Sequence, residues 1–353
     1  LICNLDQRQG LCACPRAERL ILVTLFRPVS WGDDMLRLTT LIFLMFLAAC
    51  AENGTGTGSD TTDPTDPTTV EPDPADTESD ASDASDSSEP EIEPGCDVDG
   101  DLFVSEACGG DDCDDTDASV RPDQFESCDF VDNNCDDDIN EGLNCTVYAH
   151  NATELFSVDP FKGTLSYVGA VPGVVDFDTD TDGNLYGISA SVLYRLNEPT
   201  GEWIEVGALG ETDGQANGFA IDAQGNAYAT SGAYLYSVDL DTGETQTVGM
   251  VGEDIWSSGD CVVNKSNTLF MTSSDSATPG DDLVLVDAAT GVGTIVGNLE
   301  VGQIYGLTAA WGYMFGFTAD GRVVQINESE ATATQLHHFT DRVFYGAASS
   351  PSR

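Results

Sequence analysis

Short runs of alternating apolar and polar residues fill the second half of the chain, from about residue 146 to residue 350. Two examples are Val192-Leu-Tyr-Arg-Leu196 and Tyr234-Leu-Tyr-Ser-Val238. Gly and Asn residues separate one run from the next. A period of two with such punctuation is typical of β-strands joined by hairpin turns. We therefore predict antiparallel β-structure throughout this region.

The strand pattern repeats at nearly constant intervals. Tyr186, Tyr228, Phe270 and Phe315 occupy equivalent positions and are spaced 42, 42 and 45 residues apart. Each unit holds four strand-like runs, and the third run leads through a turn to a fourth that ends near Val-Gly. Four strands in a unit of this length are the signature of a β-propeller blade.

The number of blades follows from the two ends of the repeat region. Complete units begin near four positions, which are Val174, Gly218, Gly259 and Ile304. Residues 147–168 supply only three strands, whereas residues 343–348 form a lone first strand. Joining these two pieces closes the ring and removes its open edges. The sequence thus predicts an all-β, five-bladed propeller over residues 146–350. Six blades are the alternative, if one further repeat has diverged too far to be recognised.

Composition changes sharply before this region. Residues 51–95 consist almost entirely of Asp, Glu, Thr, Ser, Pro, Gly and Ala, with no aromatic residue, Cys, Lys or Arg. Such a segment buries too little apolar surface to offset its ordering entropy, and its like charges and prolines keep it extended. We predict a disordered acidic tether. A cation-binding tail is the alternative, but no ligand spacing recurs.

An export signal precedes the tether. From Met35 the chain reads MLRLTTLIFLMFLAAC, with one basic residue, a short apolar stretch and small residues before Cys50. This is a secretory signal that is too short to span a bilayer as a mature helix. Residues 47–50 resemble the lipobox of bacterial lipoproteins, which implies cleavage before Cys50 and lipidation of its sulfur. Residues 35–50 are then the signal peptide. We expect residues 1–34 to be upstream sequence included by a misplaced start, with a genuine extra N-terminal segment as the alternative.

Net charge narrows the possible partners. The chain has 62 acidic and 12 basic residues, a net charge of −50, and residues 51–145 alone carry −30. Such a polyanion repels nucleic acid and cannot bind an anionic membrane through a basic patch. Metal cations and cationic partners are favoured instead.

Residues 96–145 form a cysteine-framed module. Its six cysteines are Cys96, Cys108, Cys113, Cys128, Cys135 and Cys145. Six cysteines in a short exported segment predict three disulfides, although the fifteen possible pairings remain open. So few apolar residues lie between them that the module needs disulfides, metal or both to fold.

Carboxylates cluster between these cysteines at ligand-like spacing. The candidate metal ligands are Asp97, Asp99, Asp101, Asp112, Asp114, Asp115, Asp117, Asp129, Asp132, Asn133, Asn134, Asp136 and Asp138. Oxygen-only ligation suits Ca²⁺, whereas the absence of His and the oxidised cysteines disfavour zinc. The first cluster is not a full EF-hand loop, because Leu102 and Cys108 stand where Gly and Glu are needed.

The module also resembles a known family. DVDGD, CGGDDCDDTD and ESCDFVDNNCDDDINEG are similar to the MopE-type metal-binding motif of exported myxobacterial and related proteins. The resemblance implies metal binding without fixing the metal. Copper is suggested only by the name of the family, because the module offers no His, Met or reduced thiol to bind it. Phe130, Asp137 and Asn140 depart from the family pattern.

Fold-level analogy places a binding site at the mouth of a propeller channel. The candidate mouth residues are Asp176, Asp178, Asp213, Asp254, Trp256, Asp260, Tyr305 and Arg342. Residues 178–183 are interpreted as a hairpin turn, with a calcium loop as the alternative. His150, His337, His338 and Cys261 are interpreted as structural.

Together these features predict a non-enzymatic bacterial lipoprotein of the outer membrane or cell surface. Its lipid anchor contacts the membrane, its acidic module binds calcium, and its propeller binds an extracellular protein or glycan. Two alternatives remain open. One is an exported hydrolase or lyase acting on a glycan or lactone, and the other is an extracytoplasmic metal-sequestering protein.

Overall fold

The computed structural model describes residues 95–353, except residue 198 and residues 275–277. The upstream segment, the signal peptide, the lipidated Cys50 and the tether up to residue 94 lie outside this range, so their predictions stay predictions. Within it, the only helical element is a 3-10 turn, η1 (Glu106–Cys108). No helix among the described residues is long and apolar enough to cross a membrane.

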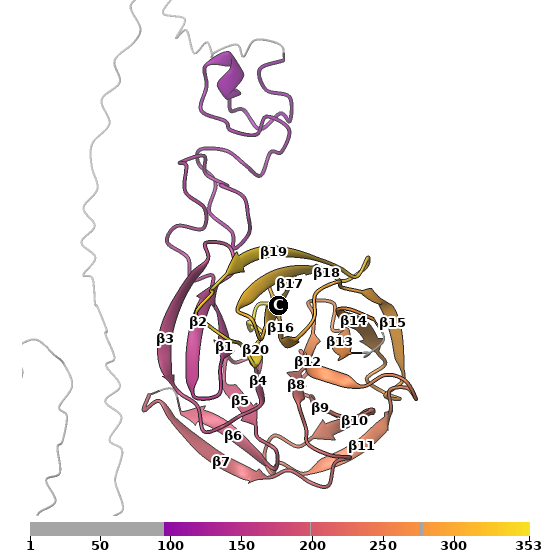
Figure 1. Ribbon diagram of the computed structural model, residues 1–353. Helices are drawn as coiled ribbons and strands as arrows, with labels where there is room; N and C mark the ends of the chain where they lie inside the picture. Colours follow the sequence, from indigo (N-terminus) through magenta and orange to yellow (C-terminus); the bar gives the residue numbers. More distant parts are fainter. Residues whose placement is uncertain (1–94, 198, 275–277) are drawn as a thin grey trace, which may run out of the picture. The chain divides into compact units, whose positions relative to one another are not determined.

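Residues 146–353 form five four-stranded antiparallel sheets around a central axis (Figure 1). The ring-closing blade contains β20 (Gly346–Ala348), β1 (Val147–His150), β2 (Glu154–Asp159) and β3 (Thr164–Ala170). The next blade contains β4 (Asp176–Thr179), β5 (Leu185–Ile188), β6 (Val192–Asn197) and β7 (Glu202–Ala208). The third contains β8 (Gly218–Ile221), β9 (Ala227–Ser231), β10 (Tyr234–Val238) and β11 (Thr245–Met250). The fourth contains β12 (Ser257–Val263), β13 (Leu269–Ser274), β14 (Asp281–Val286) and β15 (Gly293–Asn298). The fifth contains β16 (Ile304–Ala310), β17 (Tyr313–Thr318), β18 (Arg322–Asn327) and β19 (Thr332–His338).

The ring closes as the sequence predicts. β20 pairs with β1, so that Tyr148 lies opposite Ala348 and Ala149 opposite Ala347. Strands from the two ends of the repeat region therefore share one sheet. This confirms five blades and excludes the six-bladed alternative.

Outer strands of the blades share one irregularity. In every blade the pairing of the third and fourth strands shifts register once, as between Leu193 and Tyr194 or between Leu283 and Val284. Such a bulge twists an exposed edge strand and makes pairing with another chain less favourable.

Aromatic and aliphatic side chains fill the spaces between neighbouring blades. The largest fully buried ones include Phe156, Phe177, Phe219, Phe315, Phe317 and Phe344. Each contributes about 1.5–3 kcal/mol through burial of apolar surface. The propeller is therefore held together by an ordinary apolar core, and its single cysteine, Cys261, is free and buried as predicted.

The cysteine-framed module is held together differently. Three disulfides join Cys96 to Cys108, Cys113 to Cys135, and Cys128 to Cys145. Few of its apolar side chains are buried. Phe130 packs edge-on against Phe161 and Tyr313 of the propeller, with ring centroids 4.8 and 5.4 Å apart.

Candidate metal centre and propeller channel

Two of the three predicted acidic clusters meet in the module. One carboxylate oxygen from each of Asp99, Asp101 and Asp112 lies within 4.8 Å of the others, and Asp97, Asp99 and Asp115 form a second such group. The Cys96–Cys108 disulfide and a bridge between Ser105 and Asp112 bring the clusters together.

Three oxygens in this group lack hydrogen-bond donors. The Oδ2 atoms of Asp99, Asp101 and Asp112 are buried and have no hydrogen-bond partner, and Asp112 is only 1% exposed. A buried, unpaired carboxylate oxygen is costly, and several that converge repel one another. A bound cation removes both costs, so the residues present fit the metal that the sequence implies.

The first loop is shaped for this purpose by its own backbone. Oδ1 of Asp97 accepts hydrogen bonds from the amides of Gly100 and Asp101, at 2.7 and 3.1 Å, and its Oδ2 accepts from Leu102 at 3.3 Å. Leu102 has a φ of 80°, a left-handed conformation that normally favours Gly. The turn that an EF-hand loop needs at its sixth position is therefore formed here despite the Leu side chain.

Charge in the cluster is only partly compensated by protein groups. Desolvation, followed by the nearby Asp101, Asp112 and Asp97 carboxylates, raises the pKa of Asp99. The single basic residue of the module, Arg121, lies 3.9 Å from Oδ2 of Asp101 but bonds more closely to Asp123 at 2.7 Å. The cluster therefore retains a strong demand for positive charge.

The third acidic cluster does not join this group. Both carboxylate oxygens of Asp132 accept backbone amides, from Asp136 and Asp137. The side-chain oxygen of Asn133 accepts the amide of Ser127, a contact within the same part of the module. The remaining predicted ligands also make local turn hydrogen bonds, namely Asp114, Asp117, Asp129, Asn134, Asp136 and Asp138.

The three departures from the family pattern have structural explanations. Asp137 has a φ of 72° and so adopts the conformation that Gly would adopt. Asn140 is buried and hydrogen-bonds to both the amide and the carbonyl of Asp129. Phe130 is the residue that packs against the propeller.

Three of the predicted mouth residues lie buried on the innermost strands. Asp176 and Asp178 of β4 accept the amides of Phe219 and Ile221 on β8, at 2.6 and 2.8 Å. Asp260 of β12 accepts the amide of Leu307 on β16. These carboxylates therefore tie one blade to the next, a role that a single repeat cannot reveal.

One end of the channel also carries a cation. The Arg353 guanidinium donates to Oδ2 of Asp178 at 3.0 Å, and both side chains are at most 6% exposed. Asp176, at the other end of the same strand, has no such partner among the described residues. Burial and Asp260 raise the pKa of Asp176, and burial raises the pKa of Asp260 to about 8.

His150 lies beside Asp176 and was not among the predicted site residues. It is fully buried, and burial lowers its pKa to about 4. Its Nδ1 is 2.7 Å from the carbonyl of Asn151, while Nε2 has no hydrogen-bond partner. His150 is an isolated histidine in the sequence, so no motif marks it as functional. Only its position where β1 meets β20 could have drawn attention to it.

The other predicted mouth residues lie outside this buried set, and their role in binding stays a prediction. Trp256 is 53% exposed in the loop before β12, and Tyr305 and Tyr345 pair with ring centroids 6.3 Å apart. Asp213 and Asp254 are exposed. Arg342 stacks over Phe156 and lies 3.8 Å from Glu154, so its charge is already partnered.

Two further predictions concern turns and histidines. Asp180 accepts the amides of Asp182 and Asn184, which confirms a hairpin turn, although Asp178 and Thr179, predicted to belong to it, lie in β4. His337 and His338 each place Nε2 near a backbone carbonyl, of Pro160 and Asp320 respectively.

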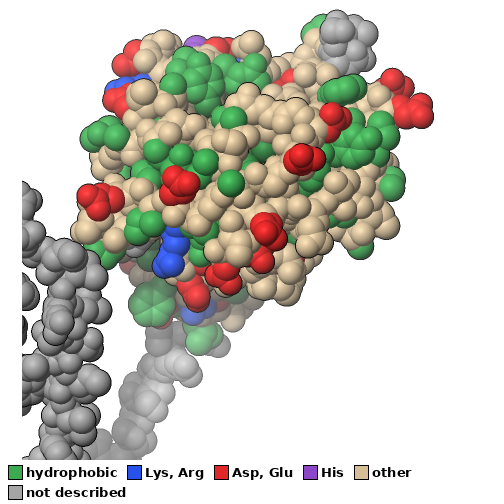
Figure 2. Space-filling model, turned by 90° about the horizontal axis from the view of Figure 1, so that it is seen from below, with side chains coloured by type: hydrophobic (Ala, Val, Ile, Leu, Met, Phe, Trp, Pro, Cys, Tyr) green, Lys and Arg blue, Asp and Glu red, His purple; other side chains and the backbone are tan. Residues whose placement is uncertain are grey.

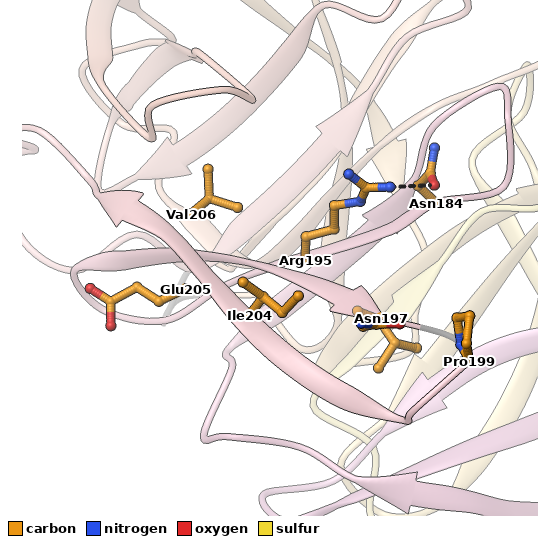
Figure 3. Close-up of a pocket in the computed structure, with 8 residues that line it drawn as sticks. Asn184, Arg195, Asn197, Pro199, Ile204, Glu205 and Val206 are labelled. Carbon is orange, nitrogen blue, oxygen red and sulfur yellow. Dashed lines mark hydrogen bonds between the residues drawn. The ribbon is translucent and has the colours of Figure 1, made fainter. Parts of the chain in front are cut away.

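A groove of about 510 Å³ lies on the blade formed by β4–β7. Arg195 crosses it toward Asn184 and donates to its Oδ1 at 3.0 Å (Figure 3). Ile204 and Val206 of the outer strand also line it. It contains none of the predicted site residues and only one cation.

A comparison with family models supports the metal-binding module. Residues 112–141 match the family described as "Putative metal-binding motif", Cu-binding MopE. No curated protein matches the chain.

Similar solved structures include virginiamycin B lyase from Staphylococcus aureus (13% identity, TM-score 0.37, 57% of this chain and 72% of that chain). A protein of unknown function from Bacteroides thetaiotaomicron shows 12% identity, a TM-score of 0.41 and coverage of 60% and 62%. TolB from Acinetobacter baumannii shows 10% identity, a TM-score of 0.37 and coverage of 58% and 66%. Likenesses this distant carry no inference about activity. What the findings do identify is a MopE-type metal-binding motif at residues 112–141, followed by a five-bladed β-propeller.

Proposed function

We propose that this protein is an exported lipoprotein in which a calcium-stiffened module carries a β-propeller that acts as a binding domain. The observation that supports the metal role is the set of three buried Oδ2 atoms, on Asp99, Asp101 and Asp112, that have no hydrogen-bond donor. Three disulfides and the MopE-type motif indicate an extracytoplasmic protein.

Calcium is proposed because every nearby ligand atom is a hard oxygen. Asp97, Asp99, Asp101, Asp112 and Asp115 supply carboxylates from two loops, which suits the high coordination number of Ca²⁺. Copper prefers imidazole, thiolate or thioether ligands, and the sulfurs of this module are all in disulfides.

A calcium titration of the exported chain, followed by calorimetry and thermal melting, tests this proposal. At free calcium about 100-fold above Kd, binding stabilises the folded module by about 2.7 kcal/mol. Asp101→Asn should weaken binding strongly. Asp117→Asn serves as the matched control, because Asp117 lies in the same module but hydrogen-bonds to Ser119 instead of joining the group.

Equal effects of the two substitutions would contradict the assignment, and so would a melting temperature that neither calcium nor chelator moves. The lipid anchor at Cys50 has a separate test. Mass spectrometry of the mature N-terminus should find a diacylglyceryl cysteine there, and a cleavage site elsewhere would rule the anchor out.

The propeller is proposed as a binding domain because its buried carboxylates already have structural roles. Asp176, Asp178 and Asp260 each accept two or more backbone amides, so these three carboxylates hold the blades together instead of forming an exposed acid and base pair. Exposed aromatic rings at the channel entrance instead offer a surface for a ligand.

A further inference from the structure

A cleft of about 800 Å³ lies where the cysteine-framed module meets the propeller. The module lines it with residues 127–129 and Leu143, and the propeller lines it with Lys265 and residues 311–313 and 352–353. Ligand sites in proteins commonly enclose about 300–1,000 Å³. None of the predicted mouth residues lines this cleft, so it is a separate candidate site.

Lys265 brings an unpaired positive charge to the cleft. Its side chain lies beside Gly312, because its Cδ and Nζ are 3.6 and 3.7 Å from the position that a Cβ on Gly312 would occupy. No described residue forms an ion pair, a hydrogen bond or a ring contact with Lys265. The other basic side chains that the structure describes each have such a partner, namely Arg121, Lys162, Arg195, Arg322, Arg342 and Arg353. In a chain with 62 acidic residues, the described cation that stays unpaired is therefore one that lines a cleft.

Trp311 has an unusual backbone conformation at the same cleft. With Gly312 it forms the two-residue turn between β16 and β17, where the φ angles are 51° and 88°. Such a turn favours Asn-Gly, and a bulky side chain at its first position costs free energy. Strain of this kind is concentrated at ligand sites. The indole ring contacts Phe161, with ring centroids 5.7 Å apart, but its Nε1 has no hydrogen-bond partner among the described residues and is not buried. The indole N–H is therefore available to a ligand.

Asp129 and Tyr313 both line the cleft and interact electrostatically. Burial and the Asp129 carboxylate raise the pKa of the Tyr313 hydroxyl, which therefore keeps its proton. Oδ1 of Asp129 accepts the amide of Val131 at 2.8 Å, whereas its Oδ2 has no donor among the described residues. The cleft thus combines three donors, which are an ammonium, an indole N–H and a phenol, with a carboxylate acceptor. A ligand that carries both an anionic acceptor and hydroxyl groups satisfies this set.

We propose that this cleft binds a uronic acid, a sugar whose carboxylate pairs with Lys265 while a ring hydroxyl donates to Asp129. Charge-assisted hydrogen bonds of the first kind are among the strongest that proteins make. The apolar face of the sugar ring contacts Trp311. This inference rests on the proposed role of the propeller as a binding domain, and it places the site at the cleft instead of the channel entrance.

Other ligand classes satisfy fewer of these groups. A neutral sugar leaves the Lys265 ammonium without an anion, and a plain carboxylic acid leaves Asp129 without a donor. The net charge of −50 repels anions at long range, but the Debye length is about 8 Å at physiological ionic strength. Contacts within the cleft therefore decide the binding under those conditions.

Titration of the full exported chain with methyl glucuronide, followed by the NMR shift of the Trp311 indole ¹H–¹⁵N signal, tests the proposal. Methyl glucoside is the matched neutral probe, because it differs only in lacking the carboxylate. Loss of a charge-assisted hydrogen bond lowers affinity by roughly tenfold or more, so the glucoside should bind at least that much more weakly. A tetramer of linked glucuronates, compared at equal sugar concentration, distinguishes an extended acidic glycan from a single uronic acid.

Variants locate the site. Lys265→Gln should lower glucuronide affinity by about tenfold and remove the preference over the glucoside. Lys162→Gln is the matched control, because Lys162 pairs with Asp138 outside the cleft and its loss should change affinity less than about twofold. Trp311→Asn suits the left-handed turn but removes the ring, so affinity should fall while thermal melting shows a folded chain. If that variant does not fold, the exposed Lys265 decides the question.

Several results would overturn the proposal. These are equal binding of glucuronide and glucoside, no binding of either, equal effects at Lys265 and Lys162, or tighter binding of free phenylalanine, whose ammonium could also serve Asp129. A glycan or peptide that binds the propeller without shifting the Trp311 signal would overturn this site and leave the binding role intact. Failure of the cleft is thereby distinguishable from failure of the proposed function.

Discussion

The module and the propeller use the same residue, aspartate, in opposite ways. In the module, carboxylate oxygens of Asp99, Asp101 and Asp112 converge without donors, so folding is tied to a cation. In the propeller, Asp178 and Asp260 are also buried, yet backbone amides of neighbouring blades satisfy them. Burial of an acid therefore does not identify a site, whereas an acid buried without a donor does.

The largest expected effect concerns disulfides. Reduction should unfold residues 96–145, because each bridge contributes about 2–5 kcal/mol and little apolar core remains. The propeller should survive, since its only cysteine is free. Limited proteolysis under reducing and oxidising conditions measures this. Simultaneous cleavage within the blades would break the proposed contrast between the two regions.

Loss of the buried ion pair should come next. Asp178→Asn leaves the Arg353 guanidinium buried without its counter-charge, which costs about 3–5 kcal/mol. The surface pair of Arg322 and Asp320 is the control, because Asp320→Asn should cost no more than about 1 kcal/mol. Urea unfolding gives both values, and similar costs would mean that burial at this channel end is unimportant.

The channel aspartates should also make stability depend on pH. Asp260 has a pKa of about 8 when folded, above its ordinary value of 3.8, so the folded state keeps a proton that the unfolded chain releases. Stability should therefore fall as pH rises toward 8, by at most about 1.4 kcal/mol per pH unit for one proton. His150, whose folded pKa is about 4, acts in the opposite direction only below its ordinary value of 6.5.

The informative window thus lies between pH 6.5 and 8. Asp260→Asn should flatten the slope there, as measured by thermal unfolding of the calcium-saturated protein. A slope unchanged by this substitution would show that Asp260 does not carry the proton that titrates in this window.

The smallest expected effect is at Leu102. This exposed residue adopts a left-handed φ that costs about 1–2 kcal/mol for a side chain. Leu102→Gly relieves that cost but adds unfolded-state entropy of about 0.5–1 kcal/mol, so the net gain is at most about 1.5 kcal/mol. Calcium affinity should rise slightly, and a decrease would mean that the Leu side chain supports the loop.

Local patterns made much of the fold predictable. Each blade repeats the same alternation and turn signals, so the four complete units and the closing strand could be identified from residues close in sequence. Many of the acidic residues occupy the turns between strands. Acidic side chains accordingly lie scattered over the face shown in Figure 2. Turn residues such as Asp180 and Asp239 hydrogen-bond to nearby backbone amides.

Contacts between repeats were not predictable. Asp176 meets an amide 43 residues away, and Asp178 meets a guanidinium 175 residues away. Nothing in either local sequence distinguishes these acids from the turn aspartates. The disulfide pairing and the separation of the third acidic cluster from the first two were hidden for the same reason, because both depend on how loops cross in space.

The pairing of β20 with β1 has a consequence for biogenesis. The two strands lie about two hundred residues apart in the chain, as the pairing of Tyr148 with Ala348 shows. A sheet assembled from such distant segments forms slowly, because a long loop must close first. Until the last strand arrives, β1 therefore lacks its partner, and this open edge is prone to pairing with other chains.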